Sequence, residues 1–137
     1  MKKKLIRKSI KSTVLLLSLL AAMTSLASLA VAVAEVDMDL MQRIEESTKS
    51  VDSNISLKDG KAALADAREI EEMFSQVELY YKHKGDATDA IEYARKSKNF
   101  ATELIRQVSE KDFDNASATV GALAKSCKTC HQVYKKS

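Results

Sequence analysis

The sequence predicts an all-α protein, an antiparallel up-down-up-down bundle of four helices. The chain has 137 residues, no proline and only three glycines, whereas a β-sandwich or barrel needs turn residues at many places. From Val36 onward the apolar residues recur at steps of three and four, the period of an amphipathic helix. The links between these stretches are short, so consecutive helices should lie antiparallel.

The first two helices are predicted from their apolar stripes. The first spans about 36–54, where the residues at alternating steps of four and three are Asp37, Met41, Ile44, Thr48, Val51 and Ile55, four of them apolar. The second spans about 59–83, with a stripe at Ala63, Ala67, Ile70, Phe74, Val77 and Tyr81. Gly85 then predicts the end of the second helix, because glycine readily adopts the left-handed conformation that caps a helix C-terminus.

The third and fourth helices show the same spacing. Asp86 and Asp89 resemble an N-cap that opens a helix over about 87–109, with an inner face at Ile91, Ala94, Ala101, Ile105 and Val108. The fourth helix spans about 114–135, along Phe113, Ala116, Val120, Leu123, Cys127, Cys130 and Tyr134.

The bundle topology predicts which residues share one end of the molecule. The start of the first helix, the end of the second and the end of the fourth meet at the same end. Met41, His83 and His131 are therefore expected there.

Residues 1–34 are predicted to be a signal peptide, which leaves 35–137 as the working domain. A basic segment over 1–11 precedes an apolar run and a tract rich in Ala and Ser. Ala32-Val33-Ala34 has the small-x-small form of a signal-peptidase site, and Ser28-Leu29-Ala30 is an alternative.

The competing interpretation of this segment is an uncleaved membrane anchor. Ser12–Ala34 has no charge over 23 residues, which is long enough to span a bilayer. Under either interpretation the domain is exported, so we expect a periplasmic protein that meets the membrane only if the signal stays uncleaved.

Charge and motifs exclude several function classes. All basic residues of the first 34 lie within the first eleven, and no acidic residue precedes Glu35, so acidic residues outnumber basic ones in the rest of the chain. Tryptophan is also absent, and we expect no nucleic-acid partner. The sequence has no nucleophile elbow, P-loop or paired-carboxylate arrangement, so we expect no enzyme.

One motif indicates the chemistry. Cys127-Lys128-Thr129-Cys130-His131 has the form Cys-x-x-Cys-His, the signature of c-type haem attachment. On a helix the two thiols lie on one face, where each can form a thioether with a haem vinyl group. His131 lies on the same face and can bind the iron as proximal ligand. The motif predicts one covalent haem c per chain.

Two other chemistries use a Cys-x-x-Cys pair. A disulfide or thioredoxin-like redox pair suits an exported protein, but the sequence lacks the βαβ pattern around that motif. A zinc site needs four ligands, and beyond the motif only His83 is left once carboxylates are set aside. Haem is the interpretation that we favour.

Residues 127–135, Cys-Lys-Thr-Cys-His-Gln-Val-Tyr-Lys, resemble the end of the class II c-type cytochromes. This family includes cytochrome c-prime and its low-spin relatives, and its fold is similar to that of the soluble four-helix b-type cytochromes. The resemblance covers the whole mature chain in architecture, but in specific residues only 127–135 and, more weakly, Asp39-Leu40-Met41. The family usually has Arg after the Tyr, where this chain has Lys135.

The second axial ligand decides between two functions. The resemblance implies a Met ligand in the first helix of the low-spin relatives, and Met41 lies about one and a half turns into that helix, near the expected depth of His131. Met38 and His83 are the other candidates, and a Met at helical spacing can also be core filling.

With His131 and Met41 as axial ligands, the chain would be a monohaem electron carrier that serves redox partner proteins. The alternative is a five-coordinate protein similar to cytochrome c-prime that binds nitric oxide or carbon monoxide, with Met41 only lining the distal pocket. Cytochrome c-prime relatives are often homodimers, although no exposed apolar stripe in this sequence requires one.

Overall fold

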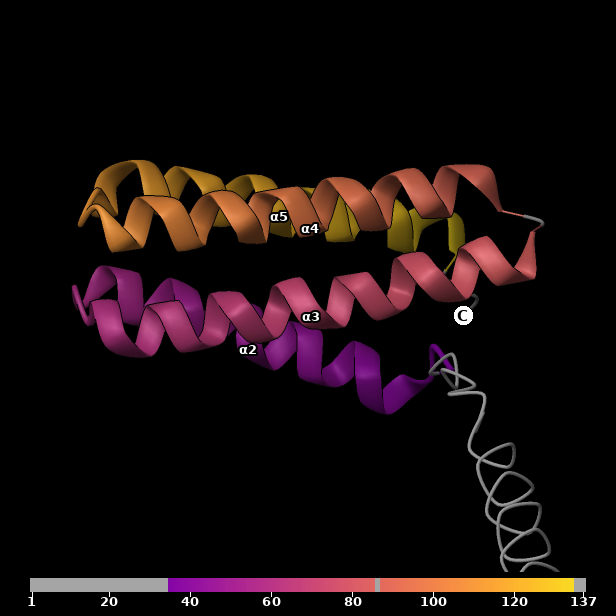
Figure 1. Ribbon diagram of the computed structural model, residues 1–137, viewed down its shortest axis with the longest axis horizontal. Coiled ribbons are helices and arrows are strands. Elements are labelled where there is room, and N and C mark those ends of the chain that lie inside the picture. The colour runs from indigo at the N-terminus through magenta and orange to yellow at the C-terminus, as the bar shows by residue number, and fades with distance from the viewer. Residues whose placement is uncertain (1–34, 86, 135–137) are drawn as a thin grey trace, which may run out of the picture. The chain divides into compact units, whose positions relative to one another are not determined.

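The computed structural model describes residues 35–85 and 87–134, which form four α-helices and, within those ranges, no strand. The helices are α2 (Met38–Ser56), α3 (Gly60–Lys84), α4 (Thr88–Ser109) and α5 (Phe113–Tyr134). Figure 1 shows that each helix runs antiparallel to the one before it. The predicted up-down-up-down four-helix bundle is confirmed. The predicted signal peptide, 1–34, lies outside the described residues.

The helix ends follow capping chemistry. The Asp37 carboxylate accepts a hydrogen bond of 2.8 Å from the Leu40 amide, and the Asp59 carboxylate accepts one of 3.1 Å from the Ala62 amide. Gly85 ends α3 with a φ of 76°, as predicted.

The predicted N-cap of α4 is wrong. The helix begins after Ala87, which makes no side-chain capping bond, and Asp89 lies inside the first turn. Asp86 lies outside the described residues.

The other two links share one geometry that the sequence does not signal. Lys58 and Lys111 have φ angles of 56° and 60°, in the left-handed region where glycine is usual. The next residue then bonds back to the helix: the Asp59 amide to the Asn54 carbonyl and the Asp112 amide to the Gln107 carbonyl, each at 2.8 Å. These two bonds satisfy carbonyls at the ends of α2 and α4, which offsets the cost of a left-handed lysine.

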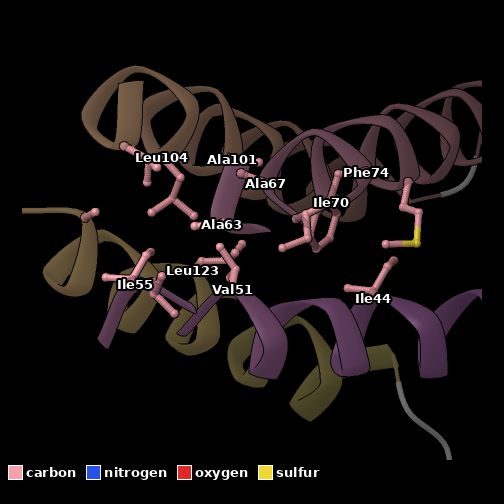
Figure 2. Packing of buried hydrophobic residues seen from close by; sticks show 14 of the residues in the cluster. Ile44, Val51, Ile55, Ala63, Ala67, Ile70, Phe74, Ala101, Leu104 and Leu123 are labelled. Carbon is pink, nitrogen blue, oxygen red and sulfur yellow. The ribbon is translucent and has the colours of Figure 1, made fainter. Parts of the chain in front are cut away.

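The core lies along the bundle axis. Figure 2 shows Ile44, Val51 and Ile55 of α2 pointing toward α3. The faces of α3 and α4 are rich in buried alanines, namely Ala63, Ala67, Ala90, Ala94 and Ala101. Small side chains let two helices approach closely, and α3 and α4 form the most extensive helix interface. The α2–α5 interface is the least extensive of the four between consecutive helices around the bundle.

Polar side chains bind α3 to the helix on each side of it. On one side the Glu69 carboxylate accepts hydrogen bonds from Arg43, at 2.9 Å, and from Ser47, at 3.2 Å, both on α2. On the other side Glu78 is buried and pairs with Lys98 of α4 at 3.5 Å. Among the described helices, none combines the length and the hydropathy needed to cross a bilayer.

Candidate functional site

Three helix ends meet where the sequence predicts them. Figure 1 shows the start of α2, the end of α3 and the end of α5 at the same end of the bundle. Met41 lies three residues after the first residue of α2, and His131 lies three residues before Tyr134. At 1.5 Å per residue, each side chain originates about 4.5 Å inside its helix. The two residues therefore lie at matching depths from the same end.

Ser126 shows which side of α5 faces α4. Its buried hydroxyl accepts a hydrogen bond of 3.0 Å from Ser97 of α4, so this side of α5 faces α4. His131, five residues later, lies about 140° around the helix axis from Ser126. Because α5 packs between α4 and α2, His131 lies on the edge toward α2.

The same reasoning gives the rotation of α2. Arg43 and Ser47 both bind Glu69, so their side of α2 faces α3. Met41 lies about 160° from Arg43 and about 120° from Ser47 around the axis. Because α2 packs between α3 and α5, Met41 lies on the edge toward α5. The edges that present Met41 and His131 thus face each other.

The two cysteines are free thiols on the inner half of α5. Cys127 is half-buried and packs against the hydrophobic core, as does Met41. Burial, aided by the charge of Cys130, raises the pKa of Cys127 to about 11. Burial also raises the pKa of Cys130, and the charge of Asp89 adds to this effect. A reactive redox pair needs a thiol with a lowered pKa, so these surroundings argue against thioredoxin-like chemistry.

The two histidines differ in their surroundings. His83 is exposed at the tip of α3, and its Nδ1 lies 3.0 Å from the Leu79 carbonyl of the same helix. His131 is exposed on the α2 side of α5. His83 thus interacts with its own helix, whereas His131 lies beside the cysteines.

The methionines of the described residues have three different environments. Met38 is 73% exposed and Met73 is 1% exposed. Met41 is half-buried against the core, so its side chain lies in an apolar environment and is still partly accessible from the surface. Met38, the alternative ligand, points into solvent.

The donor set fits haem iron. Within residues 35–85 and 87–134, no three His, Cys, Asp or Glu side chains are grouped to bind a metal ion. Instead, Cys127 packs against the core, Cys130 lies toward the start of α4, and His131 and Met41 lie on the neighbouring edges of α5 and α2. These donors are the ones that attach haem c and bind its iron in proteins.

A polar contact beside the cysteines was not predicted. The Tyr134 hydroxyl at the end of α5 donates a hydrogen bond to the Asp89 carboxylate at the start of α4. This bond is the main cause that raises the pKa of Tyr134 to about 12. The Tyr81 ring of α3 lies 5.8 Å from the Tyr134 ring. The sequence places an acidic residue in the first turn of α4, but only the packing of α4 on α5 shows that this residue meets Tyr134.

No protein-family model, curated protein or solved structure matches this chain.

Proposed function

We propose that the chain is an exported monohaem c-type cytochrome that carries electrons between redox partner proteins. The observation that supports this most is the arrangement of one end of the bundle. There a Cys-x-x-Cys-His motif on α5 lies opposite a half-buried Met41 on α2. When bound, haem c supplies a one-electron iron couple.

Cys127 and Cys130 are proposed to hold the haem. Each thiol would add across a haem vinyl group, with sulfur bonding one vinyl carbon and the thiol hydrogen passing to the other, so the attachment would need no oxidant. The reaction needs both sulfurs reduced, and both are free thiols here. Their half-buried positions would keep the thioethers inside the apolar edge of the bundle.

His131 and Met41 are proposed to bind the iron from opposite sides. Two fixed protein ligands limit rearrangement between the oxidation states, and a Met ligand favours a higher potential than a second His. Ile44 is buried one turn after Met41 and would exclude water from the Met side.

The packing of the bundle is compatible with a flat group between α2 and α5. This interface is the least extensive of the four, so opening it costs the fewest contacts. The alanine-rich α3–α4 interface, with its Glu78–Lys98 pair, would keep the other half of the bundle intact. Figure 1 also shows α2 turning away from α3 toward its Met38 end.

Mass and absorption spectra of the exported protein test this proposal. We expect one covalently bound haem per chain and an N-terminus at Glu35. The oxidised and reduced spectra should be low-spin, and the ferrous form should resist carbon monoxide. A chain without covalent haem would overturn the proposal. A high-spin spectrum would instead favour the five-coordinate alternative that binds nitric oxide or carbon monoxide.

A further inference from the structure

A polar contact between α5 and α4, with an aromatic ring of α3 beside it, lies next to the proposed attachment residues. Tyr134 of α5 donates its hydroxyl hydrogen to Asp89 of α4, and the Tyr81 ring of α3 lies 5.8 Å from the Tyr134 ring. The Asp89 carboxylate also accepts a hydrogen bond of 3.1 Å from the Ala90 amide. The carboxylate is therefore fixed at the N-terminus of α4, where the helix dipole favours a negative charge.

Tyr134 lies close to the motif along α5. It is four residues after Cys130, and residues four apart are neighbours on one face of a helix. It is also three residues after His131, within the same turn. Whatever fixes Tyr134 thus fixes the orientation of the turn that presents Cys130 and His131.

The charge of Asp89 reaches the same turn. Asp89 is hydrogen-bonded to Tyr134, which lies four residues after Cys130 on the same face of α5, so the carboxylate lies beside this turn. The Ser97–Ser126 contact, farther along the α4–α5 interface, instead joins two uncharged hydroxyls.

We propose that Asp89 is a positioning residue for the turn of α5 that carries Cys130 and His131. Asp89 orients the end of α5 through the Tyr134 hydroxyl and places a negative charge beside Cys130. The second part rests on the proposed function. A fixed negative charge beside this turn would stabilise the oxidised, more positive state of a haem that Cys130 and His131 hold. Asp89 therefore lowers the midpoint potential of the bound group.

Two substitutions separate the hydrogen bond from the charge. Asp89→Asn keeps an oxygen that accepts from Tyr134 and removes the charge, whereas Tyr134→Phe keeps the ring and removes the hydroxyl. Asp114→Asn is the matched control for the charge. It removes an acidic residue from the first turn of α5, about 24 Å along the helix from Cys130. This distance exceeds the length over which salt screens exposed charges.

We expect Asp89→Asn to raise the midpoint potential of the holoprotein and Asp114→Asn to leave it unchanged. Equal potentials in these two variants would overturn the role of the charge. A purely structural role of Asp89 would not produce this difference.

The hydrogen bond is tested by thermal unfolding of the purified full chain. Tyr134→Phe should lower the unfolding temperature by about 4 °C in the parent. It should have no further effect after Asp89→Ala, and additive losses would overturn the orienting role. If the parent contains no haem, the proposed function fails at the mass measurement, and this cycle still decides whether Asp89 and Tyr134 are coupled.

Discussion

The buried hydroxyl of Ser97 on α4 donates a hydrogen bond of 3.0 Å to the hydroxyl of Ser126 on α5. Ser126 directly precedes Cys127, so this bond sets the rotation of α5 at the start of the motif. With Ser126 toward α4, Cys127 packs against the core and His131 lies on the α2 side. A pair of small hydroxyls thus contributes to the direction in which the motif faces.

Ser126→Ala should destabilise the protein by about 1 kcal/mol, because it leaves the Ser97 hydroxyl buried without its partner. The double variant Ser97→Ala with Ser126→Ala should be closer to the parent than the sum of the single losses. Urea unfolding of the four proteins measures the coupling. Ser117→Ala, on the exposed side of α5, is the control and should change little.

Stability should fall in acid partly through Glu78. Lys82 donates a hydrogen bond to this buried carboxylate and thereby lowers its pKa below the ordinary 4.5, and Lys98 adds to the effect. A folded pKa below the unfolded one contributes stability that is complete above about pH 5 and is lost as the pH falls through 4.5 and below.

Glu78→Gln should therefore cost about 1 kcal/mol at pH 7, since both lysines are partly solvated, and should lose less additional stability than the parent between pH 5 and pH 3. Denaturant unfolding across this range tests it. Glu72→Gln, at an exposed position of the same helix, should follow the parent curve. If the stability of the parent and of Glu78→Gln falls in parallel with pH, Glu78 does not contribute to the loss of stability in acid.

The fold was predictable because its determinants are local. The predicted helix boundaries lie within two residues of the observed ones at each end, since the apolar period and Gly85 act within a few residues. The left-handed Lys58 and Lys111 were not predictable, because lysine has no intrinsic preference for that conformation. Their conformation follows from the bonds that close each link onto the preceding helix.

The site was predictable only in part. The motif spacing alone places Cys127, Cys130 and His131 on one side of a helix, and the topology predicts that Met41 lies at the same end. The facing edges depend on contacts between helices, such as Ser47 with Glu69, which no local pattern encodes. The Asp89–Tyr134 contact depends on how far α4 and α5 overlap, so it also required the tertiary structure.

Replacing both cysteines tests the attachment. In the variant Cys127→Ala with Cys130→Ala, haem should become extractable by acidified organic solvent, because no sulfur remains to form a thioether. The unmodified protein should retain its haem under the same treatment. Covalent haem in the double variant would show that attachment occurs elsewhere.

His131→Ala removes the proposed proximal nitrogen, while the two thioethers still hold the porphyrin. We expect covalent haem by mass, loss of the native absorption spectrum and a lower unfolding temperature, since a well-bound cofactor stabilises the fold. His83→Ala is the matched control, because His83 is exposed and interacts with its own helix through the Leu79 carbonyl. A native spectrum in His131→Ala would eliminate this ligand, and a change only in His83→Ala would indicate bis-His iron.

Met41 decides between the two functions. If its sulfur binds the iron, the oxidised protein should show the weak red-edge absorption of an iron–thioether bond, and Met41→Ala should become high-spin and bind carbon monoxide readily. Ile44, buried one turn later, would line the vacated position.

Met38→Ala is the control for Met41→Ala, because Met38 is 73% exposed and should not reach the iron. Met41 also packs against the core, so its truncation should cost about 1–2 kcal/mol even without haem, below the range for a fully buried Met. A stability loss alone is therefore no proof of ligation, and the spin state is the deciding measurement. If Met41→Ala lowers stability but leaves a low-spin spectrum, Met41 is a core residue and another group binds the iron. If the unmodified protein is already high-spin, electron transfer loses its main physical support and binding of a small gas becomes the better assignment.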